Sequence, residues 1–238
     1  MLLEASTLAA VAALSIAAAI VGGMGGFGTG VILAAALVPL IGVKALVPVM
    51  AVAGVIINAG RFWFYRESLE RRALGVVLVC ALPFLVFGTW LYSVLDARSV
   101  GTILGLAVIA SVPLRRILGK KAVMLSRPGL AVGSGIFGLA SGLATGTGVI
   151  LVSLLLGTGM SGPAVLATDA LVSIALDLTK AALFQRFNLL DAQAFFTGVV
   201  IGIASIPGSA IAAAPVTAAT LPPSSLIAMN ARAWTLRR

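Results

Sequence analysis

The chain has 238 residues, of which 61% are hydrophobic and only 10% are charged, with a mean hydropathy of +1.17 and a formal net charge of +9. A soluble domain carries roughly 25% charged residues, so this chain lacks the polar side chains that would cover a water-facing surface. The composition therefore excludes a soluble globular enzyme, a disordered chain and a disulfide scaffold, and it indicates an all-α polytopic membrane protein.

Long stretches without charge predict the membrane segments. Each stretch holds one or two segments near the length of about 20 residues that a hydrocarbon core requires. In chain order, we expect apolar segments at about 5–22, 28–41, 45–64, 73–95, 99–114, 129–144, 147–160, 163–184 and 192–214. A basic connector separates the fifth segment from the sixth and contains Arg115, Arg116, Lys120, Lys121 and Arg127. The tail 215–238 is Pro-containing, and whether it forms a final span stays open.

The second half of the chain repeats the first. The hexapeptide from Gly28 to Leu33 recurs letter for letter from Gly146 to Leu151. A Gly-rich run precedes each copy, and a short and then a longer apolar segment follow it. We therefore expect two membrane repeats, at 1–118 and 119–238.

The number of times that each repeat crosses the membrane predicts how the two repeats are oriented relative to each other. The Gly-broken pair contributes an even number of crossings and the three further segments an odd number, so the second copy is inverted, as in many secondary transporters. The basic loops agree: Arg66, Arg71 and Arg72 and the basic connector fall on one side, predicted to be cytoplasmic. The loop from Arg186 to Asp191 has one base and one acid, and we expect it on the other side.

The Gly-rich breaks are the first candidate site. A half-helix that starts at Thr29 leaves its first N–H groups without partners in the helix, and Thr29 could cap some of them. The inverted copy, starting at Thr147, would aim at the same point, so that two helix N-termini form a pocket for a small anion. The predicted binding residues are Gly28, Thr29, Gly30, Gly146, Thr147 and Gly148. The alternative is that these glycines only allow close helix packing.

Polar residues inside the spans form the second candidate site. Asn58 and Arg61 are three residues apart and so share a helix face, as do Asp177 and Lys180. We expect Asn58, Arg61 and Lys180 to contribute to anion binding and Asp177 to be a candidate for proton coupling. The alternative is that Arg61 and Lys180 extend to the membrane interface from helix ends. Asp169, near the start of its segment, is interpreted as an interfacial or helix-start acid.

Several functions lack the residues that they need. The chain contains no His, which removes His-based metal sites, Ser-His triads and His proton relays. The single cysteine, Cys80, lies mid-span and is interpreted as a packing residue. No P-loop motif is present, and no nucleophile–base pair is evident. We therefore expect no enzyme activity, no cofactor, no metal and no nucleic-acid partner.

At this point the residues resemble a known family. The run Gly-Gly-Met-Gly-Gly-Phe-Gly-Thr-Gly from Gly22, its echo before Val149 and the region of Asn58 are similar to the TauE/SafE family of membrane transporters. The resemblance covers roughly 5–214. It implies export of sulfite or movement of organosulfur anions, and it carries the glycine-motif positions onto Gly28 to Gly30 and Gly146 to Gly148. The Pro- and Ser-containing end departs from the apolar helix with which the family typically finishes.

Together these features predict a multi-pass secondary transporter of the cell inner membrane for a small sulfur-containing anion, working by alternating access. A passive anion channel and a non-transporting membrane scaffold or accessory subunit stay open as alternatives. A cation transporter is disfavoured because intramembrane acids are few. The expected partners are the small anion, the lipid bilayer and, in a homo-oligomer, further copies of the chain; the exact substrate and the direction of transport stay open.

Overall fold

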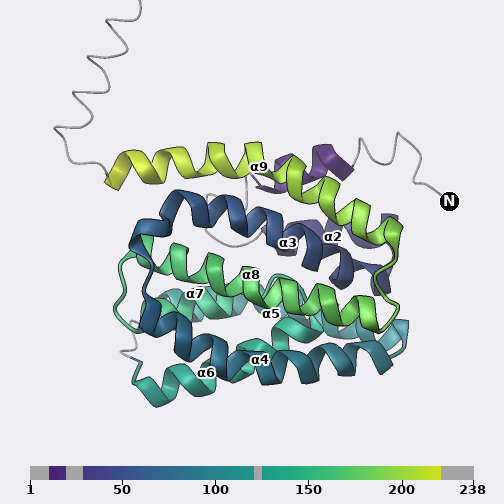
Figure 1. The fold of residues 1–238 in the computed structure, drawn as a ribbon, viewed down its shortest axis with the longest axis horizontal. Coiled ribbons are helices and arrows are strands. Elements are labelled where there is room, and N and C mark those ends of the chain that lie inside the picture. The colour runs from purple at the N-terminus through teal and green to yellow at the C-terminus, as the bar shows by residue number, and fades with distance from the viewer. Residues whose placement is uncertain (1–10, 20–28, 121–124, 221–238) are drawn as a thin grey trace, which may run out of the picture.

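The computed structural model describes residues 11–19, 29–120 and 125–220, and this part of the chain is built from helices without a strand. Residues 11–19 form the first helix. The following elements are α2 (Thr29–Ile41), α3 (Val43–Tyr65), the 3-10 turn η1 (Arg66–Ser68), α4 (Arg71–Val94), α5 (Ala97–Lys120), α6 (Arg127–Leu143), α7 (Gly148–Gly157), α8 (Gly162–Arg186) and α9 (Ala192–Thr220) (Figure 1).

The expected all-helical membrane protein is confirmed. Among the described residues, three helices are long and apolar enough to cross a membrane: α3 with η1, α4 and α8. The remaining apolar helices are shorter over their described residues. One boundary differs: α5 continues through Lys120, so Arg115, Arg116 and Lys120 belong to the end of a helix rather than to a connector.

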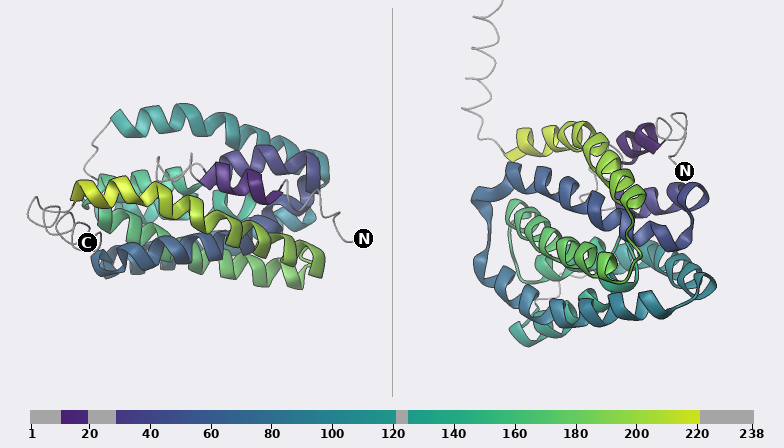
Figure 2. Two further views of the ribbon diagram at one scale, coloured as in Figure 1. Left: turned by 90° about the horizontal axis from the view of Figure 1, so that it is seen from above. Right: turned by 45° about the vertical axis from the view of Figure 1, so that its right-hand side comes forward.

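The long helices are stacked in order (Figures 1 and 2). Helix α3 packs against α9 on one side and α8 on the other, and α8 in turn packs against α4. α3 and α8 run antiparallel, because Arg61 near the end of α3 meets Asp169 near the start of α8, while Gly54 in mid-α3 meets Asp177 further along α8. The α3–α8 pair is therefore one of the main contacts between the two halves of the chain, together with α4–α6 and α3–α9.

Glycines join α4 tightly to α6. A Cβ added to Gly88 of α4 would lie 2.6 Å from the carbonyl oxygen of Leu139, and one added to Gly142 of α6 would lie 2.7 Å from the carbonyl oxygen of Leu85. Gly138, four residues before Gly142, abuts the backbone of Ala81 in the same way. This spacing is the small-xxx-small packing pattern of membrane helices. Gly138 and Gly142 of the second Gly-rich run therefore pack α6 closely against α4.

The two predicted kinds of loop lie at opposite ends of the bundle (Figure 1). η1 and the start of α8 lie at one end, where the backbone N–H of Glu70 donates a hydrogen bond to Oγ1 of Thr168 at 3.3 Å. The loop from Arg186 to Asp191 follows the far end of α8. This arrangement fits an inverted repeat, but the boundaries of the repeats and the sides of the membrane stay predictions.

Candidate functional site: the α6–α7 break and the α3–α8 charged group

The chain breaks between α6 and α7 at the second Gly-Thr-Gly motif. Ala144 is extended, and Gly146 has φ of +81°, a conformation that side chains other than hydrogen rarely adopt. α7 then begins at Gly148 and has only 10 residues. At a rise of about 1.5 Å per residue, such a helix covers about half of a hydrocarbon core of about 30 Å. α7 is therefore a half-helix that starts inside the fold.

The start of α7 has no side-chain cap. Thr147 is the N-cap residue, but its hydroxyl donates to Oγ of Ser141 at 3.1 Å rather than accepting a hydrogen bond from the backbone. A Cβ added to Gly148 would meet nothing within 4 Å, so the first turn of α7 borders open space. The N-terminal N–H groups of a helix carry partial positive charge. This end of α7 can therefore take an anionic partner.

The start of α2 lies against the same break. A Cβ added to Gly30 would lie 3.2 Å from both Cα and N of Gly146 and 3.4 Å from Oγ1 of Thr145. Residues 116 positions apart thus meet within one turn of the start of each short helix. Gly28 and the side chain of Thr29 lie outside the described residues. The structure brings the two predicted motifs together at Gly30 and Gly146.

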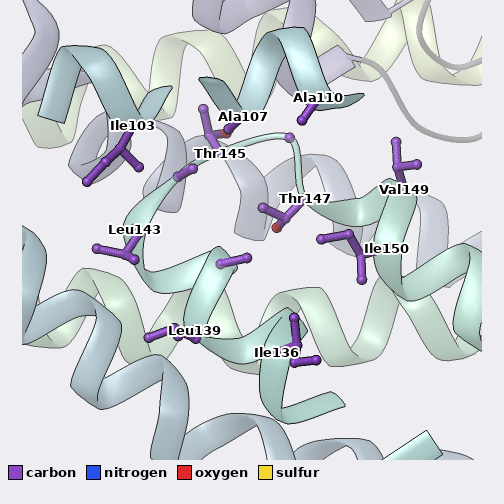
Figure 3. Close-up of a pocket in the computed structure, with 13 residues that line it drawn as sticks. Ile103, Ala107, Ala110, Ile136, Leu139, Leu143, Thr145, Thr147, Val149 and Ile150 are labelled. Atoms are coloured by element: carbon purple, nitrogen blue, oxygen red, sulfur yellow. The ribbon is translucent and has the colours of Figure 1, made fainter. Parts of the chain in front are cut away.

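A cavity of about 350 Å³ opens beside this contact (Figure 3). Its volume falls at the lower end of the range of about 300–1,000 Å³ that ligand pockets take. In Figure 3, α5 residues stand on one side, α6 residues on the other, and the α6–α7 break runs between them. The break contributes Thr145, Gly146 and Thr147, and the rest of the lining is apolar: Ile103, Ala107, Ala110, Ile136, Leu139, Ala140, Leu143, Ala144, Val149 and Ile150.

The predicted polar residues of the spans form a separate group between α3 and α8. Nζ of Lys180 lies 2.7 Å from Oδ1 of Asp177, and both side chains are buried. The Asp177 carboxylate also fills the space beside Gly54 and takes a hydrogen bond from Asn58. The Lys180 ammonium is therefore held inside the protein, against Asp177. None of these residues lines the cavity at the break, so the predicted binding residues fall into two groups.

Arg61 also points into this interface. Its Nη2 lies 3.3 Å from Oδ2 of Asp169, and its Nη1 donates to Oδ1 of Asn58 at 3.2 Å. The interpretation of Asp169 as a helix-start acid is wrong, because the first turn of α8 contains no acid and Asp169 is only 2% exposed. Its position relative to the membrane interface stays a prediction. The signal was present in the spacing, because Asp169, Asp177 and Lys180 lie 8 and 11 residues apart, which places them on one helix face. In the described part of the chain, no three His, Cys, Asp or Glu side chains gather closely enough to hold a metal ion.

Comparison with known proteins identifies the family. The model of the sulfite exporter TauE/SafE family matches residues 11–230, nearly the whole chain. No curated protein and no solved structure matches.

Proposed function

The chain belongs to the TauE/SafE family of sulfite exporters, and on this premise we propose that it is a multi-pass secondary transporter of the cell inner membrane. Membership of the family supports an anion transporter of the membrane, and no enzyme activity is proposed. The proposed cargo is sulfite or an organosulfonate, moved by alternating access and without a cofactor.

The contact between Gly30 and Gly146 carries this proposal. It places the starts of α2 and α7 side by side, and a helix N-terminus acts as roughly half a positive charge. Two such ends supply about the charge of one cation without a side chain that would itself need a counter-ion inside the membrane. The proposed binding residues at this point are Gly28 to Gly30 and Gly146 to Gly148.

The cavity beside the break supports the substrate class. Thr145 and Thr147 give it one polar end, and the residues of α5 and α6 give it apolar walls. An oxyanion at the helix starts would leave any organic group of an organosulfonate against those walls. Sulfite would occupy the polar end alone.

The α3–α8 group supplies the charged residues of the proposal. Arg61, Asn58 and Lys180 are proposed to attract the anion, although Arg61 and Lys180 each already face a carboxylate. An anion that reaches them must compete with that carboxylate, which is a suitable arrangement for binding that is followed by release. Asp177 is the residue of this group that the sequence proposes for proton coupling.

A flux experiment separates this proposal from its alternatives. Purified protein is reconstituted into vesicles, and sulfite uptake is followed against concentration, with protein-free vesicles as the control. An alternating-access transporter gives uptake that saturates. Uptake that rises linearly favours a passive anion channel, and uptake no greater than in the control favours a scaffold or accessory subunit.

A further inference from the structure

The second oxygen of the Asp169 carboxylate is buried and has no hydrogen-bond partner among the described residues. Oδ2 faces Arg61, whereas Oδ1 has essentially no exposed surface. A buried carboxylate oxygen without a partner is energetically unfavourable, since the group has left water and gained nothing at that atom. A proton bound to Oδ1 would neutralise the carboxylate and so reduce this energetic penalty.

Asp177 differs from Asp169 in this respect. Its Oδ1 is paired with Lys180 at 2.7 Å, and Asn58 donates a further hydrogen bond to the carboxylate. The carboxylate of Asp177 is therefore well satisfied in its charged form. Of the two buried acids of α8, Asp169 is the one whose surroundings leave room for a proton.

The ion pair of Asp169 also crosses between the halves of the chain. Arg61 belongs to α3 and Asp169 to α8, whereas Lys180 and Asp177 lie on the same helix. Arg61 and Lys180 occupy corresponding positions of the two repeats, but only Arg61 forms its ion pair with a residue of the other half of the chain. Loss of the negative charge on Asp169 would remove the attraction between α3 and α8 at this point.

From this geometry we infer that Asp169 is a proton-binding site, and that binding of the proton releases Arg61 from the ion pair so that Arg61 can take the transported anion. The carboxylate gains one proton from water and becomes neutral, while Arg61 keeps its charge. The inference that Arg61 then serves the anion rests on the proposed function; the proton site itself does not. It follows that anion binding strengthens as the pH falls.

Few other charged groups surround Asp169. On α8 itself, Asp177 lies about two turns away and is matched by Lys180. On α3, Lys44 is half-buried and lies at the opposite end of the helix from Arg61. The remaining elements packed against α8 bring their charges to exposed positions near its start: Arg66 and Glu67 of η1, Glu70 before α4, and Arg71 and Arg72 of α4. α7 and the described side chains of α6 contain no ionisable group. Arg61 is therefore the charge that governs Asp169 most directly.

The test uses methanesulfonate, whose charge stays constant across the pH range in which a carboxylate of this kind titrates. Calorimetry in two buffers of different ionisation enthalpy reports the protons taken up per anion bound. The wild-type protein is expected to take up about one proton, and D169N about none, with binding that no longer depends on pH. The surface control E67Q should behave as the wild type does, and D177N should still take up about one proton for each anion that it binds. Proton uptake that persists in D169N would overturn the inference.

A second readout does not depend on anion binding. The infrared C=O stretch of a protonated carboxyl group in the purified protein is expected to appear as the pH is lowered, to persist in D177N and to be lost in D169N. If no band is lost in D169N, the proton site is refuted. If the band is lost in D169N but the wild-type protein binds neither methanesulfonate nor sulfite, the proposed function fails and the proton site stands.

One further variant guards against misfolding of D169N, which removes the partner of a buried Arg61. The double variant R61Q/D169N replaces the ion pair by two neutral groups that can still hydrogen-bond. It is expected to elute from size exclusion as the wild type does and to lack the titrating band. A band that survives in the double variant would also refute the assignment.

Discussion

Gly30, in the first turn of α2, lies against Gly146, two residues before the start of α7, so closely that a Cβ on Gly30 would sit 3.2 Å from the Cα and N atoms of Gly146. The two glycines come from the two copies of the same motif. The proposed anion site depends on this approach, because each short helix presents its N-terminal N–H groups only near its own first turn.

Substitution of Gly30 by Ala should weaken sulfite binding. The new methyl group forces the starts of α2 and α7 apart by a few tenths of an ångström, and the partial charges of the two helix ends then act less strongly together. We expect about a tenfold loss of affinity, or about 1.4 kcal/mol. Gly75→Ala is the control, because Gly75 lies in α4 with nothing within 4 Å of its added Cβ; an equal loss in both variants would contradict the account.

Two glycines with the same backbone conformation separate stability from binding. Gly146 has φ of +81° and Gly159 has φ of +80°, so Ala at either position is strained by roughly 1–2 kcal/mol. Gly159→Ala meets no neighbour, whereas Gly146 touches Gly30. Both variants should lower the temperature of unfolding, but only Gly146→Ala should reduce sulfite affinity. Reduced affinity in Gly159→Ala would show that backbone strain alone explains the effect.

The pair Asp177 and Lys180 should show strong coupling. Lys180→Met leaves a buried carboxylate without its cation, which costs about 3–5 kcal/mol of stability, and Asp177→Leu leaves a buried ammonium with a similar penalty. The double variant removes both charges and should be more stable than either single variant. The free energies of unfolding in denaturant of the wild type, the two single variants and the double variant give the coupling energy of the pair. If the two single effects simply add, the ion pair does not exist in the membrane protein.

The sidedness of two loops tests the inverted repeat. In a Cys80→Ser background, Glu67→Cys in η1 and Arg186→Cys at the end of α8 each provide one exposed thiol at opposite ends of the α3–α8 pair. A membrane-impermeant thiol reagent added to sealed inside-out vesicles should label the first, and the same reagent on intact cells should label the second. Labelling of both thiols from one side would rule out the predicted topology.

Much of the fold could be predicted from the sequence, because the charge-free stretches and the Gly-rich breaks mark helices directly. α3, α4 and α8 begin and end within a few residues of the expected segments. Asp169 was misjudged because its partner, Arg61, lies 108 residues earlier, and the pairing exists only once α3 and α8 are packed together. The different roles of the glycines in the second half could not be predicted from the sequence either. Gly138 and Gly142 pack against α4, whereas Gly146 forms the break between α6 and α7. Only the backbone that lies next to each glycine in the folded protein distinguishes these roles.

Sulfite binding to the purified protein, measured by calorimetry beside the variant Thr29→Val/Thr147→Val, tests the central claim most directly. Thr197→Val is the control, because that hydroxyl bonds only to the backbone of its own helix, at the carbonyl oxygen of Gln193. The account predicts saturable binding in the wild type and the control and its loss in the double variant. Equal binding in all three proteins would contradict it and would place the anion away from the paired starts of α2 and α7.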